Sequence, residues 1–95
     1  MTFTTILHIS FDVSDDHDEI NASRSVQLKF PPYPGLKLTI PYLGRLITYA
    51  IVGVNYEIGR DFFRCTTVTQ DEIKAEMREK FVSALIEDGW WILDG

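Results

Sequence analysis

The spacing of apolar residues in this chain changes once, near Thr69, from a period of two to the period of an α-helix. Before that point, apolar side chains recur at every second position in short segments separated by proline, glycine or polar residues, which is typical of β-strands. We therefore predict an α+β fold. It consists of a bent antiparallel sheet of four to six strands (a half-barrel is one form of it), one C-terminal amphipathic helix packed on one face, and a short terminal strand.

The bulk composition predicts one soluble domain over residues 1–95. The hydrophobic fraction of 45% and charged fraction of 24% are ordinary for a globular protein. Cys65 is the only cysteine, which excludes an intramolecular disulfide. The N-terminal residues alternate in polarity without a basic leader, and no apolar run approaches the ~20 residues needed to cross a bilayer. We expect a cytoplasmic protein that does not enter a membrane.

The predicted strands begin with Phe3–Val13, whose odd-numbered residues should be buried. Further strands are expected at 25–30, with Phe30 inward, at 36–40, and at 45–58, with a bend at Gly53. A turn at Gly59 and Arg60 should fold the last of these into a hairpin. Its register would pair Tyr56 with Phe63 and Val54 with Cys65, and would point Tyr56 inward.

The predicted helix covers residues 70–88. Thr69 and Glu72 match a capping box at its start, and Gly89 fits its end. The expected buried stripe of this helix consists of Ile73, Met77, Phe81, Val82, Leu85 and Ile86. Trp90 and Trp91 follow in the terminal strand at 90–93. Successive strand residues point to opposite faces, so only one of the two tryptophans can enter the core.

Residues 14–23 are predicted to form a flexible acidic loop, because they are mostly polar and carry contiguous carboxylates. The spacing of Asp15, Asp16, Asp18 and Glu19 does not fit a calcium loop, so no metal site is predicted. Clustered acids can instead attract a basic partner and speed association with it. These four residues are therefore candidate partner-binding residues.

Catalytic motifs are not evident. His8, Ser10 and Asp12 share one strand face, but alternate residues on a strand are attached roughly 6.5–7 Å apart, so their side chains are expected to diverge. Cys65 is expected to be a small buried hydrophobic residue. We predict no catalytic residue and no cofactor.

Four further candidates for partner binding are aromatic or basic. Phe62 and Arg64 should lie on the sheet face that the helix leaves open, and one of Trp90 and Trp91 should be exposed. Tryptophan and arginine are enriched at binding hot spots. The sequence therefore predicts a small non-enzymatic protein-binding module that occupies the surface of a partner protein. Small inhibitors, immunity proteins and phage antagonists of host enzymes are of this size and type.

Two other functions remain as alternatives. Six of the nine basic residues and all four tyrosines lie between residues 24 and 64, as in a module that binds single-stranded nucleic acid. The residues that it would use are Lys29, Lys37, Arg45, Arg64, Tyr33 and Phe62. The net charge of −5 disfavours this alternative.

The second alternative is an enzyme whose pocket is formed by residues distant in sequence. Self-association into a homodimer also stays open.

Overall fold

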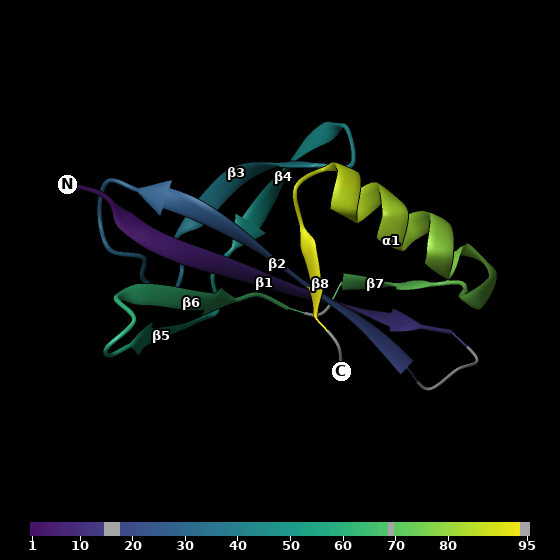
Figure 1. Cartoon of the computed structure of the whole chain (residues 1–95), viewed down its shortest axis with the longest axis horizontal. Coiled ribbons are helices and arrows are strands. Elements are labelled where there is room, and N and C mark those ends of the chain that lie inside the picture. The colour runs from purple at the N-terminus through teal and green to yellow at the C-terminus, as the bar shows by residue number, and fades with distance from the viewer. Residues whose placement is uncertain (15–17, 69, 94–95) are drawn as a thin grey trace.

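A computed structural model describes residues 1–14, 18–68 and 70–93 of the chain (Figure 1). The described strands and helices are, in chain order, β1 (Phe3–Val13), β2 (Asp18–Leu28), β3 (Lys37–Tyr42), β4 (Arg45–Ala50), β5 (Gly53–Glu57), β6 (Phe62–Thr66), β7 (Gln70–Ile73), the 3₁₀ helix η1 (Ala75–Met77), α1 (Arg78–Glu87) and β8 (Trp91–Leu93). The predicted α+β class is confirmed. The C-terminal helix and the short terminal strand are confirmed with it.

The main sheet has six strands in the order β5-β6-β1-β2-β8, with β7 also paired to β1. Most neighbouring pairs are antiparallel, but β1 runs parallel to both β6 and β7, so the sheet is mixed. A separate two-stranded sheet is formed by β3 and β4. The described strands do not close into a barrel, and the molecule is elongated, with extents of 43 × 25 × 22 Å.

The long hairpin of β1 and β2 corrects the predicted loop at 14–23. The prediction of β1 is confirmed at both ends, and β2 begins at Asp18, so six of the ten residues of the predicted loop are strand. The same strand ends at Leu28, and Phe30 is 45% exposed, so the prediction that Phe30 points inward at the end of a strand over 25–30 is wrong. Ile20 and Ala22 face Phe11 and Ile9 across the hairpin and are almost fully buried. These two apolar residues, separated by one polar residue, supply burial that the polar composition of the segment does not suggest. Residues 15–17 lie outside the described part of the chain.

The predicted strand at 45–58 is divided between two sheets. After β4 pairs with β3, the N–H of Ile51 still donates to the carbonyl oxygen of Leu36, the residue before β3, and the N–H of Val52 donates to that of Thr66 in the main sheet. The chain therefore changes sheets just before Gly53, where the sequence predicts a bend. An added Cβ at Gly53 would lie 2.7 Å from Thr66 Oγ1, so this crossing requires glycine.

The hairpin of β5 and β6 has the predicted register, since Tyr56 pairs with Phe63 and Val54 with Cys65. Its loop is four residues long, from Ile58 to Asp61, and Gly59 adopts a φ of 89°. Tyr56 lies on the same sheet face as the fully buried Cys65, as the predicted inward direction requires, and it packs on the Phe63 ring at 4.9 Å. It remains 49% exposed, however, and so does not belong to the buried core.

The first part of the predicted helix is a strand instead. Phe62–Thr66 pairs with β1 as β6, and Gln70–Ile73 pairs with it as β7, with Gln70 opposite Phe11 and Ile73 opposite Val13. The free edge of β1 offers backbone partners that outweigh the local helix signal, and Ser14 donates a 2.8 Å hydrogen bond to the Ile73 carbonyl oxygen. The helix proper begins at Arg78 without a side-chain cap, so the predicted capping box is wrong at Glu72; Thr69 is outside the described residues.

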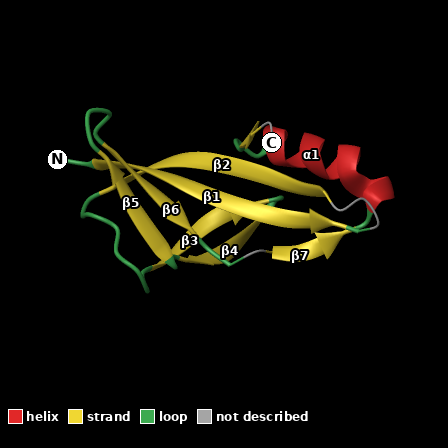
Figure 2. Cartoon of the chain, turned by 90° about the horizontal axis from the view of Figure 1, so that it is seen from below, coloured by secondary structure: helices red, strands yellow, loops and turns green. Residues whose placement is uncertain are grey.

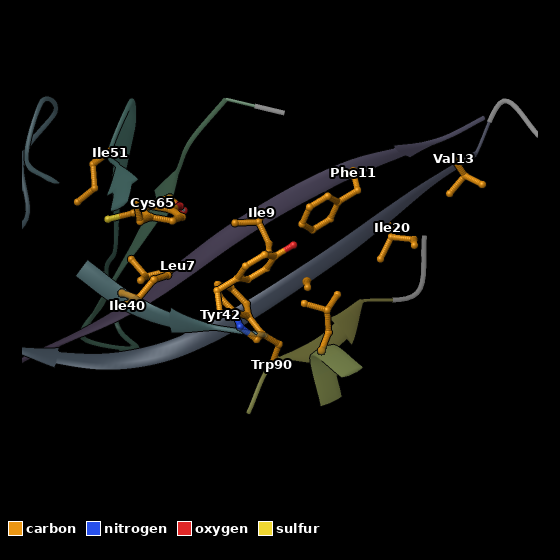
Figure 3. Close-up of a cluster of buried hydrophobic side chains, with 13 residues drawn as sticks. Leu7, Ile9, Phe11, Val13, Ile20, Ile40, Tyr42, Ile51, Cys65 and Trp90 are labelled. Carbon is orange, nitrogen blue, oxygen red and sulfur yellow. The ribbon is translucent and has the colours of Figure 1, made fainter. Parts of the chain in front are cut away.

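The core lies on one face of the main sheet, which is covered by the small sheet and by α1 (Figures 1 and 2). Side chains of β1 project into this core, with Leu7, Ile9 and Phe11 at its centre (Figure 3). The Phe11 ring packs on Phe81 of the helix at 4.8 Å and on Tyr42 of the small sheet at 6.2 Å. Phe81, Val82 and Leu85 face the core as predicted, whereas Met77 and Ile86 are 43% and 56% exposed.

The end of α1 decides the positions of the two tryptophans. Gly89 has a φ of 97°, its N–H donates to Ile86 and the N–H of Trp90 donates to Leu85, which is a Schellman motif. This motif turns Trp90 back against the helix, where it is 2% exposed and meets Tyr42 edge-on. Trp91 then points to the other side of the sheet and is 42% exposed. The predicted division of the pair is confirmed.

Candidate functional site

The face of the main sheet that α1 and the small sheet leave uncovered contains a hollow of about 440 Å³. We call it the open-face hollow; its lining residues are Ile6, His8, Ser23, Phe62, Arg64, Thr66, Trp91 and Leu93. Its volume lies within the range of pockets that hold small ligands or side chains of a partner. Two aromatic side chains, an arginine and several polar side chains meet in this concave surface.

The strand registers explain why these residues meet. Ile6 and His8 alternate with the buried Leu7 on β1 and so point to the open face. Thr66 of β6 lies opposite His8 on one side, and Ser23 of β2 lies opposite it on the other. Trp91 of β8 lies opposite Ser23, which completes a line of side chains across four strands. Arg64 lies opposite Ile6 in the neighbouring line.

A chain of polar contacts runs from the hollow along the open face. The Ser10 hydroxyl donates a 2.8 Å hydrogen bond to Asn21 Oδ1, and the Asn21 amide donates to a Glu19 carboxylate oxygen at 3.0 Å. His8 Nε2 lies 3.2 Å from Ser10 Oγ, and His8 Nδ1 lies 3.4 Å from Ser23 Oγ. Since the Ser10 proton is directed at Asn21, Ser10 accepts from Nε2–H, and Nδ1 is left to accept from Ser23.

His8 and Ser10 are therefore closer than expected from their attachment points, and the predicted divergence of these side chains is wrong. A nucleophilic serine gives its proton to a histidine, which acts as the base. In this chain the serine donates to the asparagine and the histidine donates to the serine, which is the opposite direction. Asp12 is exposed at the far end of the strand, and no hydrogen bond joins it to His8 among the contacts of the described residues.

Arg64 forms the cationic part of the hollow. Its guanidinium lies 5.8 Å from the Phe62 ring centroid and 3.6 Å from a Glu57 carboxylate oxygen, in an ion pair whose side chains are 50% and 38% exposed. Exposed ion pairs of this kind contribute little to folding, about 0–1 kcal/mol. Phe62 itself is half-buried, so the prediction that it is an exposed aromatic residue is only partly correct. The guanidinium remains accessible to a ligand.

The structure brings together three of the eight predicted partner-binding residues, namely Phe62, Arg64 and Trp91. Trp90 is buried under the helix and is removed from the candidates. Glu19 is exposed in β2 and lies opposite Asp12, about four strand positions from the hollow's centre at His8. Asp18 belongs to the same strand, and only its backbone is described; Asp15 and Asp16 lie outside the described residues.

Sequence reasoning missed four residues of the hollow: Ile6, Ser23, Thr66 and Leu93. It considered His8 only for catalysis and did not name it as a partner-binding residue. One of them carried a signal, because Ile6 is a large apolar residue on the otherwise polar face of the first strand. The sequence also contained a signal for the burial of Trp90, which excludes it from the hollow: the residue after a helix-ending glycine commonly packs back on the helix. The remaining residues depend on pairings between distant segments, which alternation alone does not identify.

The described residues give little support to a reactive thiol, a metal site or a membrane-spanning helix. Cys65 is fully buried, and burial raises the pKa of its thiol to about 11, so a reactive thiolate is disfavoured. Within residues 1–14, 18–68 and 70–93, no three His, Cys, Asp or Glu side chains gather as metal ligands. In the same part of the chain, the helices are too short or too polar to span a membrane.

Comparisons of the chain with protein-family models, with curated proteins and with solved structures find no match.

Proposed function

We propose that this protein is a small non-enzymatic protein-binding module of the inhibitor, immunity-protein or antagonist type, and that the open-face hollow is its binding site. The observation that carries the proposal is that Trp91, Phe62 and Arg64 line one concave surface. Tryptophan and arginine in a pocket that a partner can desolvate are the residues that most often dominate protein–protein affinity.

The hollow combines two properties of a protein-binding surface. Trp91 and Leu93 are 42% and 40% exposed although both are large and apolar, and Ile6 extends the apolar lining across the sheet. Polar side chains, among them Ser23 and Thr66, line the same surface. Apolar anchors with interspersed hydrogen-bonding groups are typical of the centre of a protein interface.

The hydrogen bonds of the polar chain disfavour an enzyme. Each hydroxyl and ring nitrogen from Ser23 to Ser10 has a partner within the chain, and Ser10 donates to Asn21 instead of to the histidine. A general base must be able to accept the proton that the reaction releases. Recruiting His8 as a base for Ser10 would require Ser10 to give up its bond to Asn21. Ser23, whose hydroxyl donates to His8 Nδ1, is only 3% exposed and is therefore poorly placed to attack a substrate.

The distribution of basic residues disfavours a nucleic-acid-binding module. Lys37 and Arg45 lie at opposite ends of the β3–β4 hairpin, opposite Ala50 and Tyr42, and neither lines the hollow. Of the six residues named for this alternative, Phe62 and Arg64 alone line the hollow. A single guanidinium beside a Glu57 carboxylate is a weak phosphate-binding surface.

The test is an affinity pull-down from lysate of the cells that carry the gene, with and without nuclease. Four immobilised proteins are compared: the wild type, Trp91→Ala, Arg64→Ala, and Tyr33→Ala as a control at an aromatic residue that is 53% exposed outside the hollow. We expect a stoichiometric partner that survives nuclease, is retained by Tyr33→Ala and is lost by both hollow variants. Circular dichroism and urea denaturation establish that every variant is folded.

Three results would contradict the proposal. A partner retained equally by the two hollow variants would remove the hollow as the binding site. Loss of the partner on nuclease treatment would favour the nucleic-acid-binding alternative. The absence of any hollow-dependent partner, together with turnover of a small molecule that depends on His8, would favour the enzyme.

A further inference from the structure

The main sheet ends at β5 in a free strand edge. Among the described strands, β6 alone pairs with β5, so the other side of β5 is open at the border of the sheet (Figure 1). An edge strand presents a row of unpaired N–H and C=O groups, which proteins commonly protect with lysine, proline or a very short strand. At the opposite border, β8 has three residues. By contrast, β5 has five and contains no lysine, arginine or proline.

The apolar residues of this edge have little cover from the protein itself. On the sheet face that the small sheet and α1 cover elsewhere, Tyr56 rests on the Phe63 ring but is 49% exposed, and Val54 is only partly buried. Val52 and Ile58, just beyond the two ends of the strand, are 57% and 89% exposed. Contiguous exposed apolar groups are typical of interaction surfaces. We call residues 52–58 the β5 edge.

The sequence of the β5 edge is symmetric in polarity about Asn55. The residues one and three positions away are apolar in both directions, namely Val52, Val54, Tyr56 and Ile58. A strand with this symmetry can pair antiparallel with a second copy of itself about a two-fold axis perpendicular to the sheet. Asn55 then faces its counterpart, and Val54 of each copy faces Tyr56 of the other. Such pairs of an aromatic and a β-branched side chain stabilise sheets.

The charges near the β5 edge allow two copies to approach each other. Residues 53–66 carry two acids, Glu57 and Asp61, and two bases, Arg60 and Arg64, so this hairpin has no net charge although the whole chain has −5. Pairing about Asn55 places the two Glu57 residues four strand positions apart, about 13 Å along the strands. The acidic excess of the chain therefore lies outside this contact.

The length of β5 favours the same register. An axis at Asn55 pairs all five residues of β5 with the five of the second copy. An axis displaced by one residue in either direction would pair only three of the five. The central register therefore satisfies the most backbone groups along the free edge.

We propose that the β5 edge binds a second copy of this chain, so that two main sheets join through antiparallel β5 strands centred on Asn55. A contact built on five-residue strands is small for a protein interface, so the dimer should be reversible and depend on concentration. The two open-face hollows then lie on the same side of the joined sheet. Arg64 is opposite Asn55 in each copy, so the two arginines are attached about 14 Å apart, three strand spacings.

Sedimentation velocity of the purified full chain, from micromolar to millimolar concentration, tests the dimer. We expect the average mass to rise with concentration from the chain mass of 10.9 kDa toward twice that value. Asn55→Lys and Asn55→Glu should each abolish the rise, because each places like charges directly opposite each other at the axis. An equimolar mixture of the two variants should restore it, since a lysine then faces a glutamate. Asn55 is exposed, so both variants should fold, and circular dichroism checks this.

Two control variants separate this contact from other kinds of self-association. Ser25→Lys adds the same charge at an exposed residue of β2, three strands from β5, and should dimerise as the wild type does. Trp91→Ala changes the hollow and should also dimerise as the wild type does. The dimer does not require the hollow to bind another protein, so its failure and the failure of the proposed function are distinguishable.

A disulfide between the copies tests the register without a change of charge at the axis. Asn55→Cys places two thiols opposite each other with Cβ atoms about 5 Å apart, close to the separation in a disulfide. Glu57→Cys places them four strand positions apart on the same face. Oxidation with copper–phenanthroline should cross-link Asn55→Cys and leave Glu57→Cys as a monomer on a non-reducing gel. Cys65 is fully buried and does not compete.

Four results would overturn the proposal. A wild type that keeps the mass of one chain up to millimolar concentration would leave the β5 edge to a strand of a different protein. A dimer that persists in both Asn55 variants, or one that is lost in Trp91→Ala, would place the contact elsewhere. A mixture of the Asn55 variants that stays monomeric, or cross-linking at Glu57→Cys instead of Asn55→Cys, would exclude the register about Asn55.

Discussion

The Tyr49 hydroxyl oxygen lies 2.7 Å from the carbonyl oxygen of His8. It lies 3.0 Å from the carbonyl oxygen of Cys65 as well, so one side chain of the small sheet contacts the backbones of β1 and β6 where these strands run in parallel. Tyr49 is 2% exposed, and burial raises the pKa of its hydroxyl well above the ordinary value. The strand segment that presents His8 to the open face is thus held from behind by a buried tyrosine.

Replacing Tyr49 by phenylalanine should destabilise the protein by about 1–3 kcal/mol, because the variant keeps the ring but removes the donor from two buried carbonyl groups. Urea denaturation measures the effect. The matched control is Tyr33→Phe, at a hydroxyl on a half-exposed ring, which should stay within about 0.5 kcal/mol of the wild type. Equal stability of the two variants would mean that the Tyr49 hydroxyl does not hold the sheets together.

Arg24 should be important for anchoring the helix. Its Nη1 donates to the Asp88 carbonyl oxygen at 2.9 Å and lies 3.4 Å from that of Pro41, and the guanidinium lies 5.9 Å from the Trp90 ring centroid. We expect Arg24→Met to lower the free energy of unfolding by about 1–3 kcal/mol, because charged hydrogen bonds to a helix end are lost while the apolar stem is kept.

The control for Arg24 is Arg60→Met, at an exposed arginine in the β5–β6 loop, which should change stability by about 0.5 kcal/mol or less. Hydrogen exchange of the backbone amides gives a second readout. Protection should fall first at the C-terminal turn of α1 and in β8 if Arg24 anchors them. A uniform loss of protection over the whole chain would contradict a local anchoring role.

The crossing between the two sheets should not tolerate a side chain at position 53 without a loss of stability. Gly53→Ala places a methyl group 2.7 Å from Thr66 Oγ1, so we expect a loss of about 1–3 kcal/mol from the strain. Thr66→Ala removes this oxygen, and the double variant should recover part of the loss. A double-mutant cycle with urea denaturation measures the coupling. Additive effects of the two substitutions would show that the close approach is not the cause.

Leu85 and Ile86 form a matched pair on α1. Leu85 is fully buried and Ile86 is 56% exposed. Leu85→Ala should cost about 2–5 kcal/mol, since it leaves a cavity under the helix, whereas Ile86→Ala should cost less than about 1 kcal/mol. Thermal denaturation followed at the helix signal measures both. Similar losses in the two variants would contradict the orientation of the helix on the sheet.

The stability of the protein should fall at alkaline pH through Cys65. Burial raises the pKa of this thiol from 9.0 to about 11, so the folded protein holds the proton more tightly than the unfolded chain does. Its contribution is complete below pH 9 and is lost as the pH rises through about 11. Burial also raises the pKa of Tyr42, to about 12, which adds to the same trend at higher pH.

Cys65→Ala is the control for this pH dependence. Its urea midpoint should decline less steeply between pH 9 and 11 than that of the wild type, because the titrating thiol is gone. Thiol labelling of the folded wild type should be slow in the same range, since the side chain is fully buried. Equal slopes for the two proteins would remove Cys65 from the explanation.

Local pattern was sufficient for the elements whose pairing partners lie close in sequence or whose periodicity is strong. The alternation of Phe3–Val13 predicted β1 at both ends and on the correct face. The turn around Gly59 predicted the register of β5 and β6, because a hairpin is closed by neighbouring residues. Gly89 predicted the end of the helix, since few other residues adopt a positive φ.

Local pattern failed where a distant strand edge was available. Residues 70–73 carry a helix-start signal, but they pair with the end of β1, whose backbone groups would otherwise lack partners. Residues 18–23 are mostly polar, yet β1 aligns Ile20 and Ala22 with Phe11 and Ile9 in the core. In both cases the deciding partner lies in another segment, so the gain in hydrogen bonds and burial is absent from the local sequence.

Local sequence pattern was therefore enough to establish the fold class, the polarity of the first strand and the rule that only one of Trp90 and Trp91 can be buried. Tertiary structure alone decided which strands lie beside His8, and hence that Trp91, Phe62 and Arg64 share the open-face hollow. The physical reason is the difference in range between the two kinds of information. Alternation and turn preferences act over a few residues, whereas the sides of the hollow come from segments 15 to more than 80 residues apart in the chain.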